Sequence, residues 1–107
     1  MTEQDIQNLI RIAVSKNNMI FRANVGKVRT ADGRIFDTGL PPGFCDLFGF
    51  RPDGKIFFIE VKKPGGRVRE VQKHFIDVVK RNGAIAGIAY SVEDALKIIE
   101  EEKKCTR

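Results

Sequence analysis

Hydrophobic positions recur at helical spacing in three segments of the chain. The first segment follows Thr2 and Asp5, which resemble a capping box. The second extends from about 68 to 82 and the third begins at Ser91, while the residues from about 101 to 107 are expected to fray. The pattern therefore predicts three helices, one near each end of the chain and one between them.

Four further runs have the composition of strands. They lie at residues 19–25, 44–50, 55–63 and 84–90. The polar segment from 26 to 42 is interpreted as a loop. The resulting order, α-β-β-β-α-β-α, predicts an α/β fold in which a small mixed sheet is flanked by helices.

Length and composition narrow the classes of protein to which the chain can belong. The 107 residues are 42% hydrophobic and 31% charged, which predicts a single globular domain over residues 1–107. No apolar run approaches the ~18–20 residues that a membrane span needs, and the polar N-terminus does not predict a signal peptide. Two cysteines cannot form a disulfide framework, so we expect a reducing, cytoplasmic compartment. The single histidine, His74, excludes zinc-finger spacing and histidine-based catalytic triads.

Positive charge is concentrated in one part of the chain. Residues 51–81 contain nine Lys and Arg against four Asp and Glu, which equals the formal net charge of +5 for the whole protein. The remaining residues balance at ten basic against ten acidic. Such a block favours a polyanionic partner, most often nucleic acid, although a basic surface can also serve solubility alone.

The strongest candidate chemistry lies on the 55–63 strand. Side chains alternate between the faces of a strand, so Glu60 and Lys62 share one face there. Asp46 lies on the preceding apolar run, and a tight turn between the two runs would let Asp46 face Glu60. Two converging carboxylates can bind Mg²⁺, and a nearby ammonium can stabilise a developing phosphorane. Alternatively, Asp46 is a turn cap and Glu60 with Lys62 is a surface ion pair.

These residues resemble a known family. The pattern Asp46-(x13)-Glu60-Val61-Lys62 is similar to the signature of PD-(D/E)xK nucleases, and more closely to the virus-type replication-repair nuclease (VRR-NUC) domain in its stand-alone, phage-like form. The resemblance extends from about residue 3 to residue 97. Its other motifs are Glu3 with Ile6 and Gln7, the R-x-N-x-G stretch Arg22, Asn24 and Gly26, the segment 43–47, the E-V-K-x-P core 60–64, Gln72, and the segments 82–83 and 91–95.

The resemblance implies a restriction-endonuclease-like core that cleaves phosphodiester bonds with Mg²⁺ or Mn²⁺. Asp46 and Glu60 would bind the metal together with the backbone carbonyl of Val61. Lys62 would orient the attacking water or stabilise the transition state. Cys45 stands where the family usually has proline, so we expect an altered entry into the strand but intact metal binding.

Two further side chains acquire roles from the same resemblance. Gln72 would face the site from the second helix, although by itself it is interpreted as an exposed polar residue. Glu3 would hold a metal-bound water or a second ion, although a first-turn acid also complements the helix dipole. Asp5 remains the alternative to Glu3, because the match within the first helix does not separate the two.

Nucleic-acid binding is expected from residues beside the first loop and after the 55–63 strand. These residues are Arg22, Asn24, Lys27, Arg29, Arg34, Lys63, Arg67, Arg69 and Lys73. Contacts of this kind position DNA through its phosphates without reading bases. The absence of an aromatic pattern for stacking single strands favours recognition of backbone or junction shape.

The leading hypothesis is a structure-selective DNA endonuclease of the DNA-repair type, which cleaves Holliday junctions or other branched DNA as a homodimer. A phage-encoded copy would act in the host-cell cytoplasm, with no membrane and no small-molecule cofactor. The alternative is a non-catalytic nucleic-acid-binding module on the same fold. A protein-interaction domain would leave the basic block unexplained.

Overall fold

The structure of the protein, a computed structural model, describes residues 1–24 and 27–101. The expectations for Gly26 and for the tail beyond residue 101 lie outside the described residues. Within the described part, no helix is both long and apolar enough to span a lipid bilayer.

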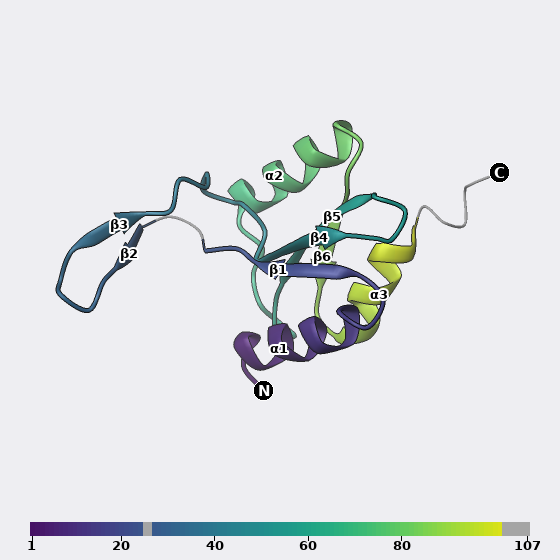
Figure 1. Cartoon of the computed structure of the whole chain (residues 1–107), viewed down its shortest axis with the longest axis horizontal. Helices are drawn as coiled ribbons and strands as arrows, with labels where there is room; N and C mark the ends of the chain where they lie inside the picture. The colour runs from purple at the N-terminus through teal and green to yellow at the C-terminus, as the bar shows by residue number, and fades with distance from the viewer. Residues whose placement is uncertain (25–26, 102–107) are drawn as a thin grey trace.

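A four-stranded mixed sheet forms the centre of the molecule (Figure 1). Its strands, in spatial order, are β1 (Met19–Arg22), β4 (Leu47–Phe50), β5 (Ile56–Val61) and β6 (Ile85–Ala89). The first three pair antiparallel, while β6 pairs parallel to β5. The small mixed sheet predicted from the sequence is therefore confirmed.

Helices cover both faces of this sheet, as predicted. α1 (Glu3–Val14) and α3 (Val92–Glu100) lie on one side, and α2 (Glu70–Arg81) lies on the other (Figure 1). The capping box expected at the start of α1 is present, with Thr2 as the N-cap. Ser91 is the N-cap of α3, because its side chain accepts a hydrogen bond from the backbone N–H of the third helical residue.

The alternation of side chains along β5 divides the hydrophobic core in two. Phe57, Ile59 and Val61 pack with residues of α1 and α3. Phe58 packs on the opposite face with apolar residues of α2. This is the division predicted for the 55–63 run, and it makes β5 the most completely buried strand, with Glu60 buried as well.

The prediction of a polar loop from 26 to 42 is wrong in one respect. The segment contains a two-stranded hairpin, β2 (Lys27–Arg29) paired antiparallel with β3 (Ile35–Asp37). Figure 1 shows this hairpin projecting away from the sheet and the helices. Strands of three residues are too short to display a clear alternation of apolar and polar positions, so the pattern gave no signal.

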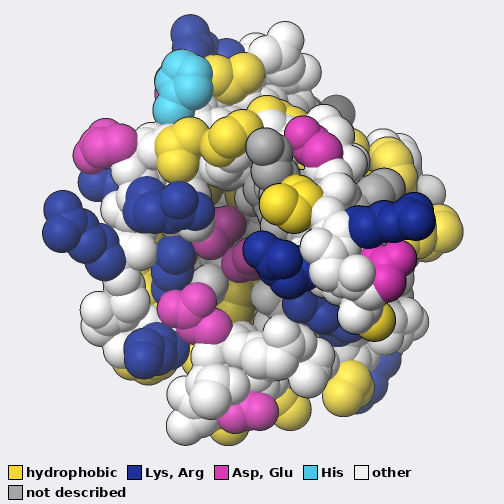
Figure 2. Space-filling model, turned by 90° about the vertical axis from the view of Figure 1, so that its left-hand side faces the viewer, with side chains coloured by type: hydrophobic (Ala, Val, Ile, Leu, Met, Phe, Trp, Pro, Cys, Tyr) yellow, Lys and Arg dark blue, Asp and Glu magenta, His cyan; other side chains and the backbone are white. Residues whose placement is uncertain are grey.

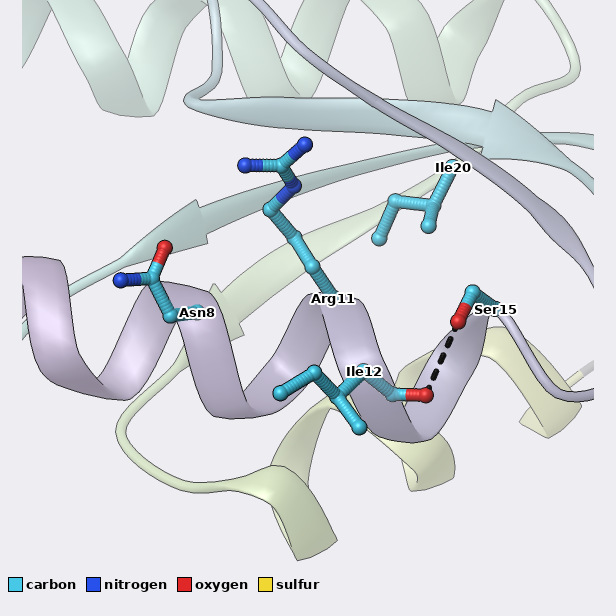
Figure 3. A pocket seen from close by; sticks show the side chains of 5 residues that line it. All are labelled: Asn8, Arg11, Ile12, Ser15 and Ile20. Carbon is cyan, nitrogen blue, oxygen red and sulfur yellow. Dashed lines mark hydrogen bonds between the residues drawn. The ribbon is translucent and has the colours of Figure 1, made fainter.

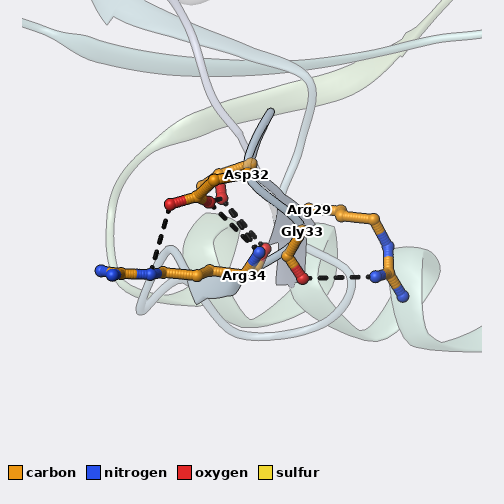
Figure 4. A network of polar contacts seen from close by, with 5 residues as sticks. Arg29, Asp32, Gly33 and Arg34 are labelled. Carbon is orange, nitrogen blue, oxygen red and sulfur yellow. Dashed lines mark hydrogen bonds and ion pairs between the residues drawn. The ribbon is translucent and has the colours of Figure 1, made fainter.

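Polar contacts close the tip of this hairpin (Figure 4). The backbone N–H of Arg34 donates hydrogen bonds to the side chains of Thr30 and Asp32. Arg29 donates from its guanidinium to the carbonyl of Gly33, which has a φ of +87°. The turn is therefore defined by backbone and side-chain hydrogen bonds and by one glycine rather than by burial.

Candidate active site

Strand pairing places the carboxylates of Asp46 and Glu60 beside each other. Leu47 pairs with Ile59 across the antiparallel β4–β5 ladder, so the residue before Leu47 faces the residue after Ile59. Oδ2 of Asp46 accepts a hydrogen bond from the backbone N–H of Val61 at 2.9 Å. Asp46 itself precedes β4, because the strand begins at Leu47 rather than at the predicted residue 44.

The chain reaches Asp46 through a close approach to α2. Gly43 has a φ of +89°, and a Cβ atom there would lie 2.4 Å from the carbonyl oxygen of Val71. Only glycine satisfies both the backbone conformation and the space. The glycine thus fixes the distance between the segment that carries Asp46 and the first turn of α2.

Glu60 is enclosed by partners that hold one of its two oxygens. Its side chain lies in the interior of the site, and the residue is 2% exposed. Oε2 accepts a hydrogen bond from Nε2 of Gln72 at 2.8 Å and lies 3.5 Å from Nζ of Lys62. Oε1 is buried and has no protein partner. The carboxylate is therefore oriented by its neighbours and keeps one oxygen for a ligand.

Gln72 is itself held in place by the start of α2. Its Oε1 accepts a hydrogen bond from the backbone N–H of Arg69 at 3.0 Å, as the third residue of a capping box does. With its oxygen used by the cap, the amide presents its N–H to Glu60. From the sequence, Arg69 is expected only to bind phosphate. The hydrogen bond from its backbone N–H to Gln72 forms only in the folded chain.

Burial changes the protonation of the carboxylate pair. It raises the pKa of Glu60 to about 7, and the negative charge of Asp46 adds to the increase, while the Lys62 ammonium opposes it. Burial also raises the pKa of Asp46, against the hydrogen bond from Val61. Two facing carboxylates of this kind repel each other when both are ionised, and a bound cation would relieve that repulsion.

The donor set fits a hard divalent cation. Carboxylate oxygens are the ligands that Mg²⁺ and Mn²⁺ prefer, and Oε1 of Glu60 is a buried acceptor without a protein donor. Among the described residues, no third acidic, histidine or cysteine side chain joins Asp46 and Glu60 closely enough to complete a site of side chains alone. Backbone oxygen and water would have to supply the remaining ligands, which Mg²⁺ readily accepts.

Glu3 approaches the same end of the sheet from α1. Its Oε2 lies 3.4 Å from the backbone N–H of Lys63, the residue that follows Lys62. Its negative charge also raises the pKa of Asp46, though less than burial does. The structure therefore brings Glu3 to the rim of the carboxylate pair.

Asp5, the alternative acid on α1, is used elsewhere. Its Oδ2 accepts a hydrogen bond from the backbone N–H of Thr2 at 2.9 Å, and its own N–H donates to the Thr2 hydroxyl at 3.1 Å. These contacts lower the pKa of Asp5, which is fully exposed. The capping box thus engages Asp5 and leaves Glu3 as the acid of α1 beside the strand end.

Cys45 is an apolar neighbour of the site rather than a ligand. The residue is completely buried and packs with Phe58, Ala84 and Ala86. Burial and the two nearby carboxylates raise the pKa of its thiol far above the usual range, so the thiol stays neutral. A neutral thiol does not compete for the cation.

Basic side chains gather on the side of the molecule that faces the hairpin. Figure 2 shows Lys and Arg side chains around recessed Asp and Glu side chains on the face toward the hairpin. The following predicted nucleic-acid contacts are exposed: Arg22, Asn24, Arg29, Arg34, Lys63, Arg67, Arg69 and Lys73. The side chain of Lys27 lies outside the described part. Lys73 pairs with Glu70 at 3.4 Å and Arg34 with Asp32 at 3.3 Å, so these two are partly neutralised.

A surface depression between α1 and β1 has a different character. Figure 3 shows its lining, which is formed by Asn8, Arg11, Ile12, Ser15 and Ile20. It contains no carboxylate, and the dashed contact in the figure is a hydrogen bond from the Ser15 hydroxyl to the carbonyl of Ile12. This depression lacks the donors for metal chemistry.

Gln7, which belongs to the motif of the first helix, received no individual role from the sequence. Gln7 is buried on α1 beside Ile6 and Ile10, and its Oε1 has no protein partner. The sequence feature that could have singled out Gln7 is a glutamine among the apolar positions of an amphipathic helix.

Comparisons with known proteins agree with this geometry. The family model of the VRR-NUC domain matches residues 1–93. A solved structure described as a VRR_NUC domain has the same fold, with a TM-score of 0.65 and 20% sequence identity. That match covers 94% of this chain and 97% of the other. A comparison with curated proteins gives no match.

Proposed function

Because the chain belongs to the VRR-NUC family of nuclease domains, we propose that it is a structure-selective DNA endonuclease that uses Mg²⁺ or Mn²⁺. The observation that carries the proposal is the pairing of Asp46 with Glu60, with Lys62 at 3.5 Å from Glu60. This combination of a buried and a half-buried carboxylate with one ammonium suits phosphodiester hydrolysis.

Asp46, Glu60 and the backbone carbonyl of Val61 would hold the metal. When bound, the metal would polarise the phosphodiester and lower the pKa of a water ligand. Gln72 keeps the Glu60 carboxylate in one orientation through its 2.8 Å hydrogen bond. Orientation by such outer partners is a large part of metal affinity.

Lys62 would act on the attacking water or on the charge that develops at phosphorus. Its side chain is largely buried, with the ammonium next to Glu60. An ammonium in a water-poor site stabilises an oxyanion more strongly than an exposed one does. Glu3, at the rim, would receive a hydrogen bond from a metal-bound water.

The substrate we propose is branched DNA, including Holliday junctions. The exposed basic side chains of the rim would contact phosphates on either side of the scissile bond, which fixes the duplex without selecting a sequence. A small domain of this kind contacts few base pairs, so recognition of shape is favoured over recognition of sequence.

We propose that two copies act together, because symmetric cleavage of two strands needs two sites. An incompletely covered apolar surface supports this idea. Met19 and Phe21 on edge strand β1 share a sheet face with Phe48 and Phe50, and Met19 is 60% and Phe21 41% exposed. Light scattering of wild type should report a dimer that Phe21→Glu converts to a folded monomer. A wild type that is monomeric at micromolar concentration would contradict the homodimer.

Cleavage of a four-way junction and of a matched linear duplex tests the catalytic proposal. Wild type should cleave the junction in Mg²⁺ or Mn²⁺ and leave it intact in EDTA. Asp46→Asn and Lys62→Met should each reduce the rate by at least ~10²-fold, the scale of losing a group that acts in the transition state. If wild type binds the junction but cleaves it in neither metal, the domain is a non-catalytic binding module. If both variants cleave like wild type, the assigned site is wrong.

A further inference from the structure

The burial of Gln7 is not explained by packing alone. Its side chain is only 8% exposed, yet no protein donor reaches its Oε1. A buried carbonyl without a hydrogen bond is costly, and nearly all such groups in folded proteins have a partner. Among the described residues, the other buried side-chain atom that has no hydrogen-bond partner is Oε1 of Glu60, at the candidate metal site.

Helix geometry places Gln7 on the same side of α1 as Glu3. Residues four apart lie above one another on one helix face, so Gln7 follows Glu3 by one turn. Glu3 contacts the backbone of Lys63 at the end of β5. Gln7 is therefore a buried polar residue one helical turn beyond the acid at the rim of the site.

The neighbours of Gln7 pack against the residues that flank the carboxylates. Ile6 and Ile10 belong to the same buried cluster as Leu47 and Val61. In the chain, Leu47 directly follows Asp46, and Val61 directly follows Glu60. The helix face that carries these residues therefore packs on the side chains that alternate with Asp46 and Glu60 along β4 and β5.

We propose that Gln7 is a positioning residue of the metal site, whose Oε1 accepts a hydrogen bond from a water molecule of the cation held by Asp46 and Glu60. This inference rests on the proposed function. Mg²⁺ and Mn²⁺ keep several waters in sites with few protein ligands, and outer acceptors orient those waters. A neutral amide provides such an acceptor without adding to the repulsion between the two carboxylates.

Two measurements on the purified chain test the proposal. One is thermal unfolding in EDTA, and the other is calorimetric titration with Mn²⁺ alone. Gln7→Leu removes the unpartnered carbonyl and keeps the volume, so the melting temperature in EDTA should rise by roughly 4–8 °C. Mn²⁺ binding should weaken about 10-fold or more, as for other partners of metal-bound groups. Gln4→Leu, the same change at an exposed position of α1, should leave Mn²⁺ binding unchanged.

Gln7→Glu provides a second variant that keeps the acceptor oxygen. It should retain Mn²⁺ binding within about 3-fold while lowering the melting temperature in EDTA, because a buried carboxylate is added. Mn²⁺ should then raise its melting temperature more than that of wild type. This pair of results would establish the role of Gln7 even if Gln7→Leu failed to fold.

The outcomes separate the inference from the function on which it rests. If wild type binds Mn²⁺ and both variants bind it equally well, Gln7 is a packing residue and the inference is wrong. If wild type itself does not bind Mn²⁺, the metal site of the proposed function fails and the role of Gln7 fails with it. A Gln7→Leu variant that is less stable in EDTA and unchanged in Mn²⁺ affinity would also overturn the inference.

Discussion

Glu60 shows how single contacts prepare a side chain for a ligand. Gln72 and Lys62 hold one oxygen of its carboxylate, and the other oxygen is buried without a protein partner. The sequence predicted that Asp46 faces Glu60, because strand alternation and a tight turn are local features. It did not predict the link from Glu60 through Gln72 to the start of α2, because that link depends on how the helix docks.

The raised pKa of Glu60 makes the stability of the metal-free protein depend on pH. The ordinary pKa of the group is 4.5, and burial beside Asp46 raises it to about 7 in the folded state. Between these values the folded protein binds a proton that the unfolded chain does not, so stability falls as the pH increases. Thermal unfolding in EDTA should therefore show a lower melting temperature at pH 8 than at pH 5.

Glu60→Gln should remove much of this fall, since the amide does not titrate. Glu93→Gln, at an exposed position of α3, should preserve it. Mn²⁺ added at pH 8 should restore stability to wild type more than to Glu60→Gln. Equal pH dependence in all three proteins would contradict the assignment of the raised pKa to Glu60.

Among the helices and strands, the sequence predicted the central sheet and the three helices but missed the hairpin of β2 and β3. The four strands of the sheet and the three helices have long or strongly periodic apolar patterns, since they form the core. The hairpin projects from that core and depends on turn contacts around Thr30 and Asp32. Its formation is therefore not encoded in hydrophobic periodicity.

Two glycines provide a test of how the segment before Asp46 is placed against α2. Gly43 and Gly54 both have positive φ, at +89° and +86°, but of these two only Gly43 has other atoms where a Cβ would lie. Gly54→Ala should destabilise the fold by about 1 kcal/mol through backbone strain alone. Gly43→Ala should cost roughly 2–3 kcal/mol, because the clash with Val71 adds to that strain. Chemical denaturation measures both, and equal losses would show that the close approach is unimportant.

Across the molecule as a whole, Lys and Arg side chains lie around recessed Asp and Glu side chains on the face toward the hairpin (Figure 2). Arg67 and Arg69 are exposed in the segment between β5 and α2, which leads away from Lys62. Both cations lie in the chain between Lys62 and Gln72, the two residues whose side chains contact Glu60. The position of the basic block thus complements a buried acidic site that would otherwise repel DNA.

Neutralising Arg67 or Arg69 should weaken DNA binding by similar factors on different sequences. The slope of the logarithm of the association constant against the logarithm of salt concentration should fall in magnitude by about 1 for each phosphate that the protein no longer neutralises. Arg81→Gln is the matched control, because Arg81 lies at the far end of α2 and pairs with Asp77 at 3.1 Å. A weakening confined to one sequence would instead indicate binding to base edges.

Glu60 is proposed to serve metal-dependent cleavage rather than folding or DNA binding, and this role can be measured directly. The measurement is the rate at which wild type, Glu60→Gln and Glu93→Gln cleave a four-way junction in Mg²⁺, with junction binding measured in parallel in Ca²⁺. We expect cleavage by wild type and Glu93→Gln, and at least ~10²-fold slower cleavage by Glu60→Gln at similar junction affinity. Cleavage by Glu60→Gln at the wild-type rate would show that Glu60 has no part in the reaction.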